Sequence, residues 1–193
     1  MSSDLRKRRP ESELPMPDLL PTLRDLLAHQ YEAALSALHL VIVRCPDELW
    51  EAPVARYKFC TTAFHVVFFG DVYLQPSDDE AAFQQQQFHR AHAAEFRDYE
   101  EFADRQPAYC YSRGFVVEYL HFVRQKAAAT ISAETAETFA GPSGFKRRQC
   151  TRAELHVYNI RHLQHHAAQL ALRLRQDNPE VSIPWVGHAW KEA

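Results

Sequence analysis

The stretch Thr151–Asp177 reads TRAELHVYNIRHLQHHAAQLALRLRQD and contains neither glycine nor proline. It opens on Thr-x-x-Glu, a capping-box pattern in which two side chains satisfy free backbone amides at the start of a helix. Apolar residues then recur every three to four positions, which predicts one long helix over residues 152–176. Asp177-Asn178-Pro179 ends this helix.

Three other proline-poor segments show the same spacing of apolar residues and are also predicted to be helices. They span residues 18–44, 62–74 and 112–131. The second of them is apolar almost all round, which predicts that it lies deep in the core. Thr61 or Thr62 is expected to cap its start, and Pro76 follows its end.

Two long connections separate these helices. Residues 76–111 are polar with a short helix predicted over 88–102, and residues 132–150 contain a Gly-Pro-Ser-Gly turn. Residues 178–193 are expected to pack back on the helices as irregular chain. The pattern predicts an all-α protein, a four-helix bundle with long connections between helices 2–3 and 3–4. We expect a flexible tail over residues 1–16 and one domain over residues 17–193.

Composition limits the partners and the compartment. A net charge of −3 gives no electrostatic basis for a nucleic-acid partner, and the basic run Arg6–Arg9 is interpreted as part of a solvated tail. No uninterrupted apolar stretch approaches the roughly 18 residues of a membrane span, and no apolar segment follows the N-terminal basic residues as in a secretory signal. These features predict a cytoplasmic protein. The four cysteines are widely spaced, so free thiols are predicted for Cys45, Cys60, Cys110 and Cys150.

The eleven histidines are the unusual feature of the composition. His162 and His166 are four residues apart on the last predicted helix, about 40° apart around its axis. Their side chains can therefore converge on one metal ion. Both fall within the apolar face, where two imidazoles are costly unless their nitrogens are satisfied. His165 falls about 100° from His166, so helical phase leaves it partly exposed or outside the ligand set.

A third ligand is predicted from His65, the single histidine of the apolar second helix. Three histidines with open positions for water or substrate form the layout of a catalytic metal site rather than a structural one. The alternative is that all three are core histidines bonded to other side chains. His121 is the main rival for the third position; His29 and His39 are expected to be solvated or hydrogen-bonded. His156 is expected to face outward, and His89, His92 and His188 carry no pattern.

The segments Ala63–Leu74 and Arg161–Leu170, with Asp47–Trp50 after the first helix, resemble the DinB-like superfamily of metal-binding four-helix bundles. The resemblance spans roughly residues 18–176 and implies a metal held by His65, His162 and His166. Three nitrogen ligands suit zinc, nickel or iron as the divalent ion and do not distinguish among them. The resemblance also implies a bacterial protein that acts on a small molecule and can form homodimers, and no membrane partner is expected.

The relatives include thiol S-transferases, a thiol-dependent isomerase and many proteins of no known activity. The resemblance therefore implies a metal-dependent thiol S-transferase or hydrolase, in which metal-bound water or a thiolate from a low-molecular-weight thiol reacts. The alternative is a non-catalytic metal-binding stress or sensor protein. Glu118, Asp71 and Asn159 are candidates for orienting the imidazoles, and Tyr119 and Tyr158 for lining the site. Cys60, a few residues before His65, is a candidate to approach the metal, with a buried structural cysteine as the default interpretation.

Overall fold

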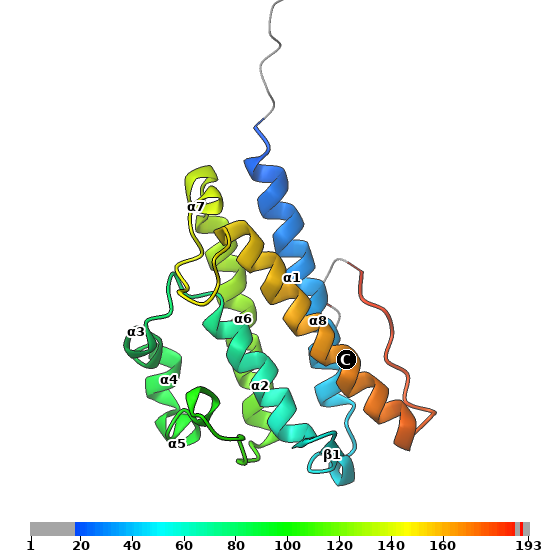
Figure 1. Ribbon diagram of the computed structural model, residues 1–193. Coiled ribbons are helices and arrows are strands. Elements are labelled where there is room, and N and C mark those ends of the chain that lie inside the picture. The colour runs from blue at the N-terminus through cyan, green and yellow to red at the C-terminus, as the bar shows by residue number, and fades with distance from the viewer. Residues whose placement is uncertain (1–17, 188–189, 191–193) are drawn as a thin grey trace, which may run out of the picture.

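A computed structural model describes residues 18–187 and 190 of the chain, so the tail expected over residues 1–16 and His188 lie outside the described part. The described chain is mainly helical, as the sequence predicts (Figure 1). Its four long helices are α1 (Leu20–Val43), α2 (Phe59–Val72), α6 (Arg113–Ala133) and α8 (Arg152–Asp177). The shorter elements are η1 (Asp47–Leu49), β1 (Pro53–Val54), β2 (Tyr57–Lys58), α3 (Glu80–Gln84), α4 (Gln87–Ala91), α5 (Ala93–Phe96), η2 (Glu100–Phe102) and α7 (Ala136–Ala140).

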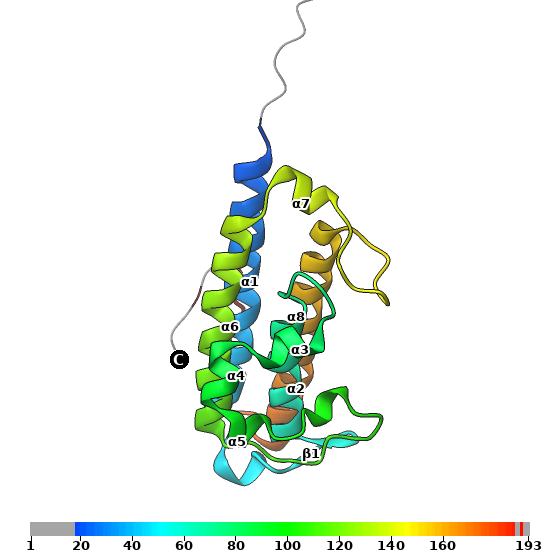
Figure 2. The ribbon, with the colours of Figure 1, turned by 90° about the vertical axis from the view of Figure 1, so that its left-hand side faces the viewer.

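The four long helices surround one hydrophobic core. Helices α1 and α2 each pack against both α6 and α8 (Figures 1 and 2). Gly70 allows α2 and α8 to approach closely, because a Cβ atom at this position would lie 3.0 Å from Leu163. At the same contact between α2 and α8, Asn159 Nδ2 donates a hydrogen bond to the Gly70 carbonyl over 2.9 Å. These contacts fix the relative position of the two helices that carry the predicted metal ligands.

The predicted helix ends are close to those observed, with one informative difference. The capping box of α8 is present, since Thr151 and Glu154 each accept a hydrogen bond from the other residue's backbone amide. Helix α2 begins three residues earlier than predicted, at Phe59. The Thr62 hydroxyl lies within the helix, where it donates to the carbonyl of Lys58 over 3.0 Å instead of capping the start. A short β1–β2 hairpin, which the sequence did not reveal, leads directly into this first turn.

The connection over residues 76–111 covers one side of α2 and α6 (Figure 2). It contains α3, α4, α5 and η2 in place of the single helix predicted over 88–102, and the chain turns at Arg97 and Tyr99 with positive φ. Asp71, fully buried on α2, anchors the connection. Its carboxylate accepts hydrogen bonds from His89 over 2.9 Å and from Tyr119 over 2.8 Å. A charge buried in this way requires such partners.

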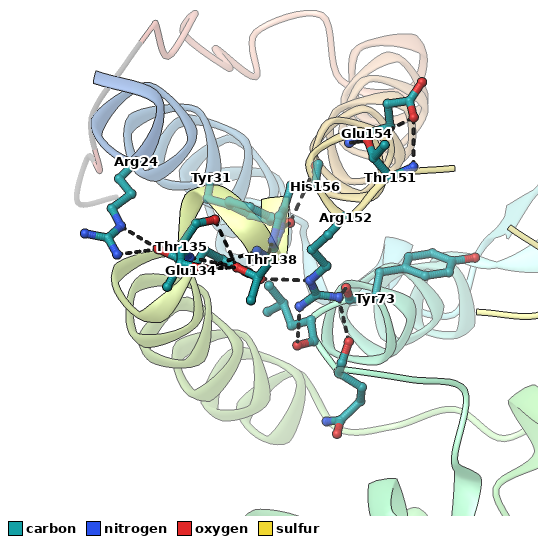
Figure 3. A network of polar contacts seen from close by, with 12 residues as sticks. Arg24, Tyr31, Tyr73, Glu134, Thr135, Thr138, Thr151, Arg152, Glu154 and His156 are labelled. Atoms are coloured by element: carbon teal, nitrogen blue, oxygen red, sulfur yellow. Dashed lines mark hydrogen bonds and ion pairs between the residues drawn. The ribbon is translucent and has the colours of Figure 1, made fainter. Parts of the chain in front are cut away.

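A second buried polar network joins α1, α7, α8 and the chain that follows α2 (Figure 3). Arg152 pairs with Glu134 over 2.8 Å and donates to the carbonyls of Leu74 and Gln75, which follow α2. The prediction that His156 faces outward is wrong. His156 is fully buried between Tyr31 and Glu134, because α1 and α7 cover that face of α8.

Helix α1 is long and apolar enough to cross a membrane by length and composition alone, which the count of uninterrupted apolar residues did not reveal. However, 67% of its most apolar window is buried inside the protein. This burial identifies α1 as a core helix. The chain after α8 packs back as irregular structure, as predicted for its described part; Trp190, for example, lies over the guanidinium of Arg124 at 4.2 Å.

A disulfide joins Cys60 to Cys110, so the prediction of four free thiols is wrong for these two residues. Fifty positions separate them in sequence, and only the fold reveals that the chain before α6 returns to the first turn of α2. Cys45 and Cys150 are free thiols, as predicted. Cys60 is bonded and fully buried, and its sulfur is therefore not available as a metal ligand.

Candidate metal centre

The structure brings His65, His162 and His166 together from two helices. His65 lies on α2, while His162 and His166 lie one turn apart on α8. One potential ligand atom from each imidazole lies within 4.8 Å of the other two. The ring centroids of His65 and His166 are 5.4 Å apart, and those of His162 and His166 are 4.8 Å apart. Donors at about 2.1 Å from a shared ion would lie at comparable separations after a small rotation of the rings.

Hydrogen bonds from one ring nitrogen orient the imidazoles of His65 and His166. His65 Nδ1 donates to the Glu101 carboxylate over 2.8 Å, and His166 Nδ1 donates to the Gln169 side-chain carbonyl over 2.8 Å. These bonds leave the Nε2 atoms of both rings for another partner. Hydrogen-bonded histidines of this kind are typical of metal sites. There the hydrogen bond from the nitrogen that does not bind the metal fixes the tautomer and the ring orientation.

His162 provides the observation that fits a metal best. Its Nε2 is buried, and none of the described residues forms a hydrogen bond with it. A buried nitrogen without a partner is costly. A divalent ion held by the three imidazoles would satisfy this atom, so the donor set fits a transition metal.

The electrostatics also favour metal binding. Burial, with a smaller contribution from neighbouring histidines, lowers the pKa of His162 to about 3 and that of His166 to about 4. Both imidazoles are therefore neutral at pH 7, which is the form that binds metal ions. These two ligands need no deprotonation before they can bind an ion at that pH.

A pocket of about 740 Å³ opens beside the histidines. His65, His166 and Glu101 are among the residues that line it, whereas His162 is not. The walls are largely apolar and include Phe69 and Leu172. A pocket of this size accommodates a small organic molecule. The arrangement therefore combines a potential metal centre with room for a ligand next to it.

The other candidate residues have different positions. Helical phase correctly sets His165 aside, since its side chain is exposed. His121 packs with His39 and Trp190 and is not part of the histidine cluster. His89, which showed no pattern in the sequence, is buried beside Asp71.

Within the described chain, none of the residues predicted to orient the ligands or line the site forms a hydrogen bond with the triad. Asp71 and Tyr119 belong to the network that anchors residues 76–111, and Glu118 pairs with His92. Asn159 bonds to the Gly70 carbonyl, and Tyr158 bonds to Arg148. The residues whose side chains do bond to the triad are Glu101 and Gln169, and the sequence analysis missed both. Gln169 follows His166 by three positions and could have been found from helical spacing, but nothing in the sequence links Glu101 to His65.

Comparison of the chain with protein families, with curated proteins and with solved structures finds no match.

Proposed function

We propose that the protein binds one divalent transition-metal ion through His65, His162 and His166 and uses it to act on a small molecule. Two observations support this: one potential ligand atom from each of the three imidazoles lies within 4.8 Å of the other two, and the buried Nε2 of His162 has no hydrogen-bond partner in the described chain. Three imidazoles suit zinc, nickel or iron and leave coordination positions open. The pocket lies on the side of His65 and His166, where a ligand could reach these positions.

A divalent ion with open positions supplies a nucleophile at neutral pH by lowering the pKa of a bound water or thiol. The chain's own residues hold and orient the ligands: Glu101 fixes the ring of His65, and Gln169 fixes that of His166. The apolar wall at Phe69 limits water around the site. The reaction class we propose is thiol S-transfer or hydrolysis of a small molecule.

We also propose that α1, α2, α6 and α8 form a DinB-like four-helix bundle. Two features support this assignment. Each of α1 and α2 packs against both α6 and α8, as in a bundle. The second long helix carries one histidine of the triad and the fourth carries two, four residues apart.

Metal analysis of the purified protein tests the site. We expect about one ion per chain in the wild type, and a strong loss in His162→Ala and in His166→Ala because each removes one of three ligands. The matched control is His165→Ala, which removes an adjacent exposed imidazole and should retain near-normal metal content. Equal losses in His165→Ala and His166→Ala would contradict the assigned ligands.

Activity is tested by combining a panel of low-molecular-weight thiols with an electrophilic aromatic halide, and separately by a panel of esters and amides. Turnover should disappear in His162→Ala and His166→Ala and persist in His165→Ala. Turnover that survives the loss of the ligands would refute the chemistry. Stoichiometric metal without turnover in either panel would favour the non-catalytic sensor instead.

A further inference from the structure

The face of α8 that carries the histidines continues beyond them to the side chain of an arginine. Gln169 and Arg173 follow His166 at three and seven positions, so they lie on the same face of the helix. Both line the pocket beside the histidines. The rise of an α-helix places Arg173 about 10 Å along the axis from His166. The pocket therefore has a histidine end and an arginine end.

A second arginine reaches the pocket from the β1–β2 hairpin. Arg56 lies in the two-residue turn between the strands and lines the pocket. Arg173 ties this hairpin to α8, because its Nε donates to the carbonyl of Pro53 over 2.8 Å. Two arginines, one from the hairpin and one from α8, are thereby held at the same pocket.

The charges near this end are not balanced. Lys58 on the hairpin pairs with Glu51 over 2.7 Å, and Arg173 pairs with Asp177. By contrast, no ion pair or hydrogen bond in the described part of the chain involves the Arg56 side chain. Arg56 therefore remains available for an anion from outside, and the Nη2 of Arg173 points to no partner among the described groups.

The turn that carries Arg56 is strained. Ala55 has a φ of 54°, a left-handed conformation that favours glycine. Strain of this kind is retained where the surrounding structure requires it, and it is concentrated at ligand sites. Here the hydrogen bond from Arg173 to Pro53 ties the hairpin to α8 in this conformation, with Arg56 at the pocket.

The wall between the two ends is apolar and open to solvent. Leu172 is 57% exposed and Tyr57 is 40% exposed, and both line the pocket. Phe69 continues the apolar surface toward the histidines. Apolar side chains grouped at a pocket mouth between charged ends fit a ligand that is itself apolar in the middle.

We propose that this pocket binds a small amphipathic anion about 10 Å long. A terminal carboxylate or sulfonate pairs with Arg56 and Arg173, the apolar body lies over Leu172 and Phe69, and the opposite end faces His65 and His166. Only the assignment of the reacting end rests on the proposed function. Recognition of the anion depends on the arginines and the apolar wall.

Octanesulfonate is a suitable probe because its extended chain matches this length and a sulfonate is a weak metal ligand. Its affinity is measured by isothermal titration with metal-loaded and with chelator-treated protein, and is compared with that of octanol. We expect octanesulfonate to bind more tightly than octanol, and Arg56→Gln to weaken it about tenfold through loss of a charge-assisted contact. The matched control is Arg147→Gln, an exposed arginine outside this pocket, which should leave the affinity unchanged.

A second pair of variants tests the apolar wall. Leu172→Asp should abolish binding of octanesulfonate, because it removes apolar surface and adds a repelling charge. Leu26→Asp, on an equally exposed leucine of α1, should have no effect. Equal affinity for octanol and octanesulfonate, or unchanged binding in Arg56→Gln, would overturn the proposal.

The outcomes for this pocket and for the metal site can be told apart. Protein that holds no metal but binds octanesulfonate through Arg56 would refute the metal centre and leave the pocket assignment standing. Protein that holds metal through the three histidines but does not prefer the sulfonate would refute the pocket assignment alone.

Discussion

At the scale of single residues, the ligand atoms of the candidate centre depend on side chains that are not ligands themselves. Glu101 is the clearest case. Its side chain is 2% exposed, and one carboxylate oxygen accepts the Nδ1 proton of His65. The other oxygen is buried, with no hydrogen-bond partner in the described chain. A carboxylate in this position holds the imidazole in one tautomer and makes its other nitrogen a stronger ligand for a metal ion.

Glu101→Gln should therefore weaken metal binding while leaving the three ligands in place. We expect a loss of roughly 10- to 100-fold in affinity, the effect of removing a hydrogen-bonded partner behind a ligand. Competition with a chromogenic chelator measures it. Glu118→Gln, which changes an exposed carboxylate paired with the different histidine His92, is the matched control. Equal affinities in the two variants would show that Glu101 does not support the site.

Residue-level reasoning from the sequence could identify the triad but not its surroundings. His162 and His166 follow from the period of one helix, which a sequence shows directly. Glu101 reaches His65 from a connection whose course depends on many contacts made elsewhere, so no local pattern predicts it. The same limit explains why the prediction for His156 was wrong. Its position on the helix was correct, but α7, which covers it, was not predicted.

At the scale of elements, the connection over residues 76–111 carries Glu101, and a buried charge on α2 anchors it. Burial opposes ionisation of Asp71, but hydrogen bonds from His89 and Lys126 outweigh this effect and keep its pKa below the ordinary value. Lys126 also donates to Gln86 over 2.8 Å. The carboxylate thus joins α2, α6 and the connection through contacts with Tyr119, Lys126 and His89.

Asp71→Asn should destabilise the protein by about 3 to 5 kcal/mol, because it leaves the largely buried Lys126 without its counter-charge. Chemical denaturation followed by circular dichroism gives the free energy of unfolding. Asp104→Asn, an exposed aspartate of the same connection, provides the control and should be neutral within about 0.5 kcal/mol. A loss below 1 kcal/mol in Asp71→Asn would mean that the connection is held by its aromatic contacts instead.

The network around Arg152 predicts how stability depends on pH. Burial lowers the pKa of His156, so it is neutral in the folded protein. Burial alone would raise the pKa of Glu134, but hydrogen bonds, chiefly from Arg152, hold it below its ordinary value. Both groups bind protons more readily in the unfolded chain, so stability falls as the pH is lowered, first through His156 and then through Glu134.

We therefore expect the free energy of unfolding to decrease from about pH 7 to about pH 5. In His156→Gln this decrease should be shallower, because one buried histidine no longer takes up a proton on unfolding. His92→Gln changes a partly exposed histidine and should keep the wild-type slope. Urea titrations across this range provide the measurement, and a wild-type slope in His156→Gln would contradict the burial of a neutral imidazole there.

At the scale of the whole molecule, the long helices were predictable because each has its own apolar period, whereas the elements between them were not. The β1–β2 hairpin consists of two-residue strands and has no glycine in its turn. Its position instead depends on Arg173 of α8, more than a hundred residues away. The disulfide is a further long-range feature, and it affects both the stability of the molecule and its expected compartment.

The Cys60–Cys110 disulfide closes a loop with a sequence separation of 50 that contains α2 after its first residue and the connection carrying Glu101. Reduction should lower the free energy of unfolding by about 4 kcal/mol, the chain-entropy value for a loop of this length. The Cys110→Ser, Cys60→Ala double variant should match the reduced protein and be insensitive to reductant. Denaturation with and without a dithiol reductant measures the difference.

A count of free thiols tests whether this disulfide exists in the cell. The host cells are lysed in an alkylating reagent, the protein is denatured, and the number of alkylated cysteines is measured. Two thiols, from Cys45 and Cys150, are expected if the disulfide is formed. Because thiols are kept reduced in the cytoplasm and disulfides persist in oxidising compartments, two thiols would argue against the cytoplasmic location predicted from the sequence. Four thiols would support that location and would mean that α2 and the connection over residues 76–111 are held together without a covalent link, by contacts such as those of Asp71 and the His65–Glu101 hydrogen bond.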